Sequence, residues 1–410
     1  MIKRVLTTSF YSIVSRFFIT ATNLFVVFYV SKYLGKMELG NYGIVFFFFI
    51  LFSVLSSFSL SLFFGKEIAK YERGSREESE ILNELILVTI IGILITLILP
   101  VIIFLFYKKI SFSLIMLSAV AGYFLGIERN LGGILLGRER MPLEAITNFF
   151  SFSVIFSSMF FSTEYFNSIN KIFFLKIFVL IAVVLLKLWF IRDHFKGLRI
   201  NLKFRFFKEG KFYWFGGMSN VVLREVDILI LSFFIDRSLL GAYFLALRIY
   251  FSFGVLSEVI TYGLTPFISR TYSGKERRGF KEFNRGVMVI ISTMALLSAL
   301  ILFFSREYII SLFAGNLVET SGKYLFYFSF LLFFRFFSFF TGMILTSTEF
   351  QKIKFYIISS SSLIMIVSDV MLAPIFQIKG IIFSRSLVEI GIFFAYAYFV
   401  RKIFKEYRSV

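Results

Sequence analysis

The chain has 410 residues, of which 58% are hydrophobic and only 17% charged, with a formal net charge of +19. A soluble protein of this length divides into several cores with polar surfaces and carries a larger charged fraction. Here apolar runs recur from end to end, each about 20 residues long, the length of helix that crosses roughly 30 Å of hydrocarbon. The composition therefore predicts an all-α integral membrane protein, because a β-barrel would show short alternating segments.

Twelve transmembrane helices are predicted. The first follows Lys3 and Arg4 and continues past residue 30 without a small-residue cleavage pattern, so we expect it to be retained rather than removed as a signal peptide. The predicted spans cover residues 8–31, 42–65, 84–106, 113–136, 143–163, 171–191, 212–235, 241–266, 286–305, 325–347, 353–373 and 380–400.

Lysine and arginine are distributed unequally between the two sides of this predicted topology. The two termini and the even-numbered connections together hold 26 of the 44, and the odd-numbered connections hold 8. Cytoplasmic loops retain Lys and Arg, so both termini are predicted to be cytoplasmic. The net charge is thus explained by topology, and no nucleic-acid partner is expected.

The two halves of the chain resemble each other at an offset of 201 residues. "ELGNYGIV" (38–45) aligns with "LLGAYFLA" (239–246), which places Gly40 on Gly241 and Tyr42 on Tyr243. Six spans in each half is an even number, so both halves enter the membrane from the same side, and the repeat is parallel, as in two-lobed transporters. We predict two six-helix lobes, 1–200 and 201–410, around a central cavity.

Polar stripes mark the first helix of each predicted lobe. Arg224 lies about 13 residues, or roughly 20 Å of helix, beyond Lys211 and is therefore well inside the hydrocarbon. The stripe in span 212–235 holds Gly217, Asn220, Arg224 and Asp227, within an arc of about 80°. The stripe in span 8–31 holds Ser12, Arg16, Thr20 and Asn23. We expect both stripes to face a water-filled cavity.

Other charged residues also lie inside the predicted spans. They include Glu128, Arg129, Lys187, Glu225, Arg248, Glu258, Arg335, Asp369, Arg385 and Glu389. A charge at the centre of a bilayer costs at least about 2.5–3.5 kcal/mol, so these groups must line a cavity or form ion pairs. Lys187, near a cytoplasmic end, is expected to extend to the interface. Asp227 either neutralises Arg224 at i+3 or acts as a protonatable switch.

Several kinds of chemistry are absent from the sequence. There is no cysteine, and the single histidine, His194, lies in "RDHFKGLR", where we expect a solvated loop residue. No Gly-x4-Gly-Lys-Ser/Thr loop and no metal-ligand spacing is present, so no cofactor and no metal are predicted. The predicted external connections, of about 6–20 residues, leave little room for the catalytic groups of a polymerase. We therefore expect a transporter rather than an enzyme.

The chain resembles the polysaccharide-biosynthesis flippases, which belong to the same superfamily as the multidrug and toxin extrusion transporters and the lipid II flippases. The resemblance covers essentially the whole chain and is carried by "YLGKMELGNYG", "KEIAKYERGSREES", "GILLGRERM", "VDILILSFFIDRSLLGAYFLALRI" and "LTPFISRTYSGKERR". It places the family's Asp on Asp227 and its Arg on Arg248. Arg224 is a departure, since the family usually has a small or polar residue there.

The resemblance implies a function and a set of partners. It implies that undecaprenyl-pyrophosphate-linked repeat units of O-antigen, lipopolysaccharide or capsule are moved across the bacterial plasma membrane by alternating access. The lipid-linked oligosaccharide and the bilayer are then partners, and so are other glycan-assembly membrane proteins such as a polymerase. The alternatives are a cation-coupled multidrug exporter and a polysaccharide polymerase.

The charged and polar groups are assigned to two predicted roles. The predicted substrate-binding residues are Arg16, Asn23, Arg129, Asn220, Arg224, Arg248 and Arg335, since arginine binds phosphate in a bidentate manner. The predicted ion- or proton-coupling residues are Glu128, Asp227, Glu258 and Asp369.

Overall fold

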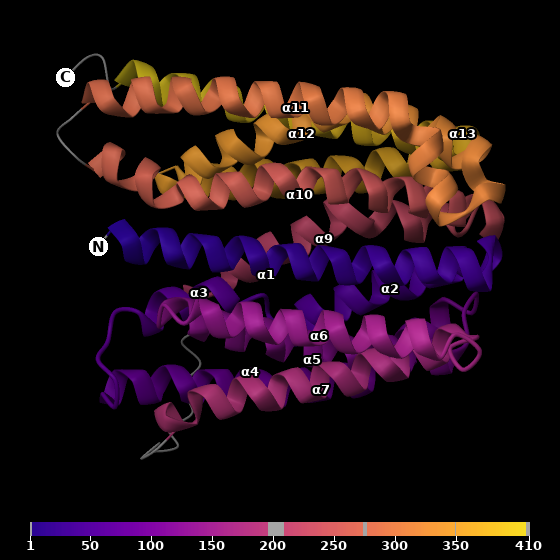
Figure 1. Ribbon diagram of the computed structural model, residues 1–410, viewed down its shortest axis with the longest axis horizontal. Helices are drawn as coiled ribbons and strands as arrows, with labels where there is room; N and C mark the ends of the chain where they lie inside the picture. Colours follow the sequence, from indigo (N-terminus) through magenta and orange to yellow (C-terminus); the bar gives the residue numbers. More distant parts are fainter. Residues whose placement is uncertain (1, 196–208, 274–276, 349, 407–410) are drawn as a thin grey trace. The chain divides into compact units, whose positions relative to one another are not determined.

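The computed structural model describes residues 2–195, 209–273, 277–348 and 350–406, and nearly all of them are helical (Figure 1). The first half contains α1 (Ile2–Tyr29), the π-helical turn η1 (Val30–Leu34), α2 (Lys36–Ser57), α3 (Ser61–Ile68), α4 (Arg76–Phe106), α5 (Phe112–Gly137), α6 (Met141–Phe161), α7 (Ile169–Ile191) and the 3₁₀ turn η2 (Arg192–Phe195). The second half contains α9 (Lys211–Leu231), α10 (Arg237–Ser273), α11 (Arg277–Phe313), η3 (Gly315–Leu317), α12 (Val318–Ser347) and α13 (Gln351–Glu406). Most of the basic midpoint segment 192–211, and residues 274–276 of "SRTYSGKERR", lie outside the described residues.

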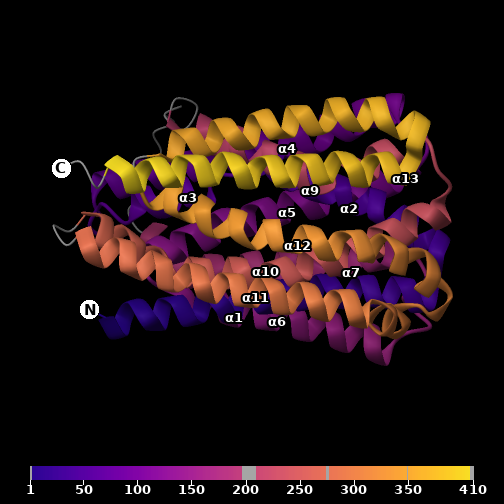
Figure 2. The same cartoon turned by 90° about the horizontal axis from the view of Figure 1, so that it is seen from above.

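Each of the twelve predicted spans overlaps one or two of these helices. In the described part of the chain, ten helical stretches are long and apolar enough to cross a bilayer. One of them, Gln351–Phe404, contains two predicted spans, because α13 folds back on itself at Gln377, where φ is 49° and ψ is −128°. Figure 2 shows the two arms of α13 side by side, and the Oγ atoms of Ser368 and Ser384 lie 2.5 Å apart across this hairpin. The charged helix α9 supplies the twelfth span, which confirms the predicted all-α membrane fold.

The predicted span 42–65 is broken into α2 and α3. Phe58 and Ser59 adopt positive φ angles of 52° and 51°, a region that L-residues rarely occupy, and the helix therefore stops there. Ser57 Oγ accepts a hydrogen bond of 3.2 Å from the Ser59 N–H and so satisfies a backbone donor at the break. Serines interrupt the apolar run here, but no glycine or proline marks the break in the sequence.

The chain forms two compact units. The first-half unit consists of residues 17–25 and 41–221, and the second-half unit of residues 1–16, 26–40 and 222–410. Helix α1 contributes residues to both, and the division in the second half falls within α9, between Val221 and Val222. The predicted lobe boundary at residue 200 lies outside the described residues.

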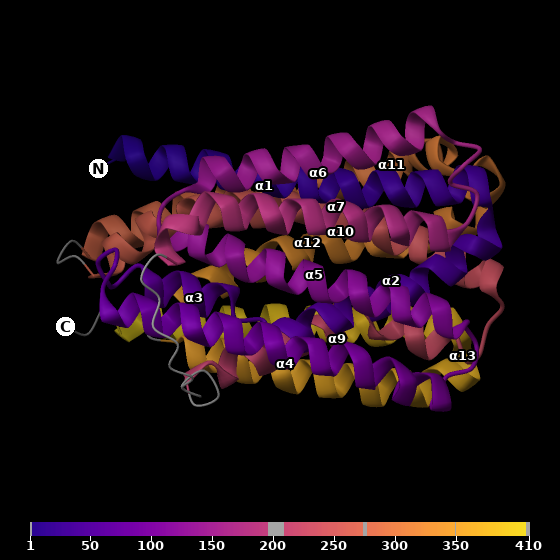
Figure 3. The same cartoon turned by 90° about the horizontal axis from the view of Figure 1, so that it is seen from below.

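Glycines allow the backbones of the first-half unit to approach closely. Helix α5 packs against α3, α4 and α7 (Figure 3). A Cβ atom on Gly126 would lie 2.8 Å from the Ser53 carbonyl oxygen, and one on Gly65 would lie 2.7 Å from the Gly133 carbonyl oxygen. Membrane helices pack through small residues in this way because lipid offers no hydrophobic drive between them. The Gly-rich segment "LGGILLG" is therefore a packing surface.

In the second-half unit, α12 packs against α10, α11 and α13, and the start of α10 packs against Lys36–Gly40. Gly40 lies against the carbonyl of Arg237, and Gly241 lies against the carbonyl of Lys36. The two glycines are 201 residues apart, and so are Lys36 and Arg237, which is the offset between the two halves of the sequence. The contact thus has the two-fold symmetry that a parallel repeat predicts.

Candidate functional site

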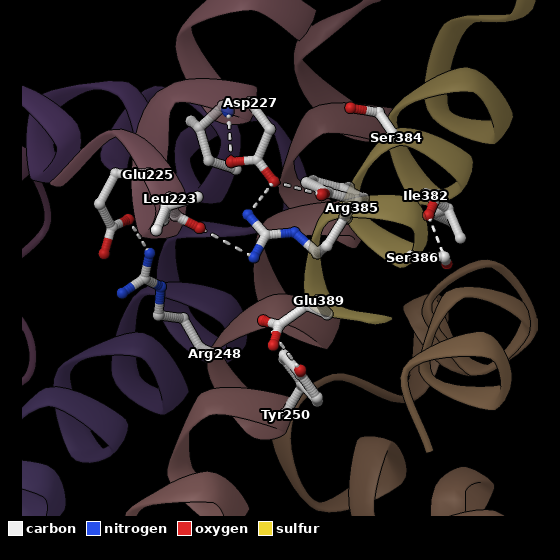
Figure 4. A network of polar contacts seen from close by, with 12 residues as sticks. Leu223, Glu225, Asp227, Arg248, Tyr250, Ile382, Ser384, Arg385, Ser386 and Glu389 are labelled. Atoms are coloured by element: carbon white, nitrogen blue, oxygen red, sulfur yellow. Dashed lines mark hydrogen bonds and ion pairs between the residues drawn. The ribbon is translucent and has the colours of Figure 1, made fainter. Parts of the chain in front are cut away.

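An arginine and an aspartate form a fully buried ion pair between α13 and α9 in the second-half unit (Figure 4). Arg385 Nη2 lies 2.7 Å from Asp227 Oδ2, and their side chains are 1% and 0% exposed. Arg385 also donates a hydrogen bond of 3.1 Å to the Leu223 carbonyl, and the hydroxyl of Tyr243 donates to Asp227. Asp227 is thus neutralised by a distant arginine, which overturns the first of the two alternatives, its pairing with Arg224 at i+3.

Two further arginines of this unit have carboxylate partners. Arg248 donates to Glu225, its neighbour on α9, and both side chains are buried. Arg335 on α12 lies 2.7 Å from Glu389 on α13. Tyr250 donates a hydrogen bond of 3.3 Å to the carboxylate of Glu389 (Figure 4). These contacts cross between helices, so the pairs fix helix packing besides neutralising charge.

Arg224 differs from these three arginines. Its side chain is half-buried, and its guanidinium carbon lies 5.0 Å from the centroid of the Phe251 ring. No carboxylate within the described ranges forms an ion pair with it. A guanidinium without a carboxylate keeps its planar set of N–H donors available for an anion.

The predicted polar stripe of the first helix is partly engaged. Arg16 Nη1 lies 2.9 Å from Glu258 on α10, with side chains 32% and 19% exposed. Asn23 is half-buried on α1. On α9, Asn220 is exposed and donates a hydrogen bond of 2.8 Å to the Gly216 carbonyl. The Arg16–Glu258 pair is therefore more exposed than the ion pairs of Arg248, Arg335 and Arg385.

The first-half unit contains a different arrangement of charges. Lys187 on α7 is 0% exposed and forms ion pairs with Glu128 on α5 and, at 2.6 Å, with Glu144 on α6. The prediction that Lys187 extends to the membrane interface is wrong, because two carboxylates from neighbouring helices hold it inside. Arg129 is exposed and donates a hydrogen bond of 3.1 Å to Ser53.

A second buried lysine of this unit escaped the sequence reasoning. Lys176 is 5% exposed, and its ammonium donates a hydrogen bond of 2.7 Å to the hydroxyl of Tyr42. The same ammonium lies 5.1–5.6 Å from the centroids of four aromatic rings, those of Tyr42, Phe46, Phe49 and Phe173. Aromatic faces attract cations, which accounts for the burial. The alignment of Tyr42 with Tyr243 is the sequence feature that points to this site, because both hydroxyls form hydrogen bonds with buried charged side chains.

His194 is not the solvated residue that the sequence suggested. It is 5% exposed, and its Nδ1 lies 2.6 Å from Glu78 Oε1. Arg138 also donates to that carboxylate, and the Gly74 N–H donates to it at 2.5 Å. This cluster ties the start of α4 to the ends of α5 and α7. Its partners come from three separate connections, so spacing along the chain could not reveal it.

The remaining predicted coupling residue, Asp369, is buried in the first arm of α13. Among the described residues, no group of three or more His, Asp or Glu side chains is arranged to hold a metal ion. Of the arginines that the structure describes inside the predicted spans of the second-half unit, Arg224 alone forms no ion pair, and the others pair with carboxylates of neighbouring helices. Such an arrangement suits the binding of an anionic group.

Comparisons with known proteins identify the family. A model described as a polysaccharide biosynthesis protein matches residues 5–252, and a MatE model matches residues 215–371. No curated protein matches the chain.

Three solved structures illustrate the likeness of fold. The first is an inward-facing multidrug resistance MATE family transporter of the MOP superfamily, with a TM-score of 0.73 and 13% identity over 95% of this chain and 96% of that one. A MOP superfamily transporter from Pyrococcus furiosus has a TM-score of 0.68 and 13% identity, over 100% and 97% of the two chains. The lipid II flippase MurJ in an inward closed conformation has a TM-score of 0.70 and 19% identity, over 97% and 89%.

The likeness to these structures shows the two-lobed, multi-pass membrane fold of that superfamily. Membership of a family follows from the sequence model, which covers more than half of the chain. The chain belongs to the polysaccharide biosynthesis protein family.

Proposed function

We propose that the chain is a flippase that moves undecaprenyl-pyrophosphate-linked oligosaccharide repeat units from the inner to the outer leaflet of the bacterial plasma membrane. The glycan would be that of an O-antigen, a lipopolysaccharide, a capsule or a similar polymer. In this proposal both termini are cytoplasmic, as the Lys and Arg distribution predicts, and glycan-assembly membrane proteins such as a polymerase are partners. The chain transports its substrate and performs no covalent chemistry.

The proposal depends on Arg224, which is partly exposed and forms no ion pair among the described residues. Arg248, Arg335 and Arg385 have carboxylate partners, whereas Arg224 forms no ion pair within the described residues and is half-buried rather than sealed. A guanidinium without a carboxylate partner leaves N–H donors that only an anion or water can satisfy inside a membrane. A pyrophosphate is such an anion and matches the fork of N–H donors in a bidentate manner.

The ion pair between Arg16 and Glu258 suggests a second contact for the headgroup during transport. Arg16–Glu258 is a part-exposed pair, and a phosphate could displace its carboxylate and take the same guanidinium donors. Arg248, Arg335, Arg129, Asn23 and Asn220 remain proposed contacts of the headgroup. Asp227, Glu258, Glu128 and Asp369 remain proposed coupling groups. The lipid tail stays in the bilayer while the polar headgroup crosses by alternating access.

The test is a complementation experiment in a strain that lacks the chromosomal copy. Arg224→Gln removes the charge but keeps a polar side chain, and we expect surface glycan to fall about tenfold or more, as for a lost charge-assisted hydrogen bond. Arg401→Gln, at an exposed arginine near the end of α13, is the matched control and should leave glycan unchanged. Membrane abundance of each variant is measured by immunoblot. Normal surface glycan in both Arg224→Ala and Arg16→Ala, at normal abundance, would contradict the proposal.

A cation-coupled multidrug exporter is the competing function, favoured by the MatE match over residues 215–371. In a MOP superfamily transporter from Pyrococcus furiosus, the reverse polarity of the binding pocket suggests a different function. An exporter of cations should expel a cationic dye, and Arg224→Gln should improve that export by removing a like charge. The flippase proposal predicts no dye export, and accumulation of lipid-linked oligosaccharide on the cytoplasmic leaflet after deletion.

A further inference from the structure

Four arginines of the second-half unit surround one phenylalanine ring. Phe251 on α10 is 4% exposed. The guanidinium carbons of Arg335, Arg224, Arg385 and Arg248 lie 4.6, 5.0, 5.4 and 5.6 Å from its ring centroid. These arginines come from α12, α9, α13 and α10, so four helices bring a cation to the same ring.

Such a gathering of like charges needs compensation. Carboxylates compensate three of the four, since Arg335 pairs with Glu389, Arg385 with Asp227 and Arg248 with Glu225. Arg224 forms no ion pair among the described residues; Glu258 and Glu225 attract it from a greater distance, and the Phe251 ring lies against it. The face of an aromatic ring carries negative charge density and attracts a cation within about 6 Å. Phe251 therefore supplies to Arg224 what a carboxylate supplies to the other three.

The kind of partner decides what Arg224 can do. A carboxylate occupies N–H donors of the guanidinium, as Glu389 does for Arg335. A ring that faces a guanidinium occupies none of them, because the attraction acts on the charge and the donors lie in the guanidinium plane. Arg224 is thus held in place while its hydrogen-bonding capacity remains available.

We propose that Phe251 is a positioning residue that holds Arg224 through a cation–π contact and so keeps its N–H donors free for the phosphate groups of the substrate. The inference rests on the proposed function and adds a residue that makes no contact with the headgroup itself. It accounts for a phenylalanine at the meeting point of four cations, where shape alone would admit any apolar side chain of similar volume.

The test weakens the ring's attraction for cations while keeping its shape. The full-length protein is produced with mono-, di- and trifluorophenylalanine at position 251, since each fluorine withdraws charge density from the ring face. Binding of inorganic pyrophosphate to the purified protein in lipid nanodiscs is measured by calorimetry. We expect the Kd to rise stepwise with fluorine number, by about tenfold at the third fluorine.

The same substitutions at Phe328 provide the matched control. Phe328 is fully buried in the same unit and contacts the rings of Tyr243 and Tyr250 rather than a cation. Fluorination there should leave the Kd unchanged. A Phe251→Leu variant should weaken pyrophosphate binding, whereas Phe251→Tyr should retain it, because an aromatic face is then restored.

The outcomes separate the two proposals. If fluorination at position 251 leaves the Kd unchanged while Arg224→Gln raises it, Phe251 is only a packing residue and this inference is overturned, but the proposed function stands. If Arg224→Gln also leaves the Kd unchanged, or if the unaltered protein binds no pyrophosphate, the anion site itself is wrong and both proposals are overturned. A stepwise rise at position 251 alone supports the inference.

Discussion

The two units bury charge in different ways. In the first-half unit the buried cations are lysines sealed by the protein: Lys187 by two carboxylates and Lys176 by aromatic rings and Tyr42. In the second-half unit they are arginines, and Arg224 and Arg16 retain partial exposure. The repeat has thus kept its backbone contacts while its charges diverged. An intramembrane charge marks a candidate binding site when its partners leave some of its hydrogen-bonding groups free for a ligand. Burial alone does not distinguish such a charge from one that only stabilises the fold.

The largest effect is expected in the first-half unit. Lys187→Met would leave Glu128 and Glu144 buried beside each other without a cation, and removing one partner of a buried ion pair costs about 3–5 kcal/mol. Thermal unfolding of the purified protein in detergent measures the loss. Lys108→Met, at an exposed lysine of the α4–α5 turn, is the control. The triple variant that adds Glu128→Gln and Glu144→Gln should regain most of the stability, and a stable single variant would contradict a purely structural role for Lys187.

A pair of arginines in the second-half unit separates structural from functional charge. Arg385→Gln orphans the buried Asp227 and should destabilise the protein by about 3 kcal/mol, whereas Arg224→Gln orphans no carboxylate and should change stability by less than about 0.5 kcal/mol. Transport should show the reverse pattern, because Arg224→Gln should lower surface glycan although its membrane abundance is normal. Adding Asp227→Asn to Arg385→Gln should restore stability. Equal destabilisation by both arginine substitutions would remove the distinction between the two kinds of charge.

Much of the fold could be predicted because bilayer thickness imposes a length and an apolar composition on each span. The parallel repeat was also visible, since Gly40 and Gly241 need small residues for a backbone contact that the sequence preserves. The break after Ser57 could not be predicted, because it depends on positive φ angles at two residues that are not glycine. The hairpin at Gln377 was located from the gap between two predicted spans.

The partners of the buried charges were beyond the sequence. Asp227 pairs with Arg385, 158 residues away, and the sequence offered Arg224 as a nearer candidate. Lys187 was assigned to the interface from its distance to a helix end, but Glu128 and Glu144 from other helices hold it inside. Periodicity identifies the face on which a charge lies. It gives no information about which helix covers that face.

The glycines at the repeat-related contact should respond equally. Gly40→Ala and Gly241→Ala each place a methyl group against a backbone carbonyl, and overpacking of this kind costs about 1–3 kcal/mol. Gly286→Ala, where an added Cβ meets open space, is the control and should be neutral or slightly stabilising. Unfolding temperatures of the three variants give the comparison. If only one of the two glycines responds, the contact is not reciprocal, and the symmetry inferred from the offset of 201 residues fails.

The smallest effect expected is at the repeat-related tyrosines. Tyr243→Phe removes a hydrogen bond to Asp227 and Tyr42→Phe removes one to Lys176, and each loss is expected to cost about 1.5 kcal/mol, because each partner is charged but keeps other contacts. Stability alone therefore does not separate the two variants, but transport should. Tyr243 bonds to the carboxylate that fixes Arg385 beside the Phe251 ring, so Tyr243→Phe should lower surface glycan measurably at matched abundance. Tyr42 bonds to a lysine enclosed by rings, so Tyr42→Phe should leave glycan unchanged once abundance is matched. A transport defect in Tyr42→Phe alone would place the functional charge in the first-half unit.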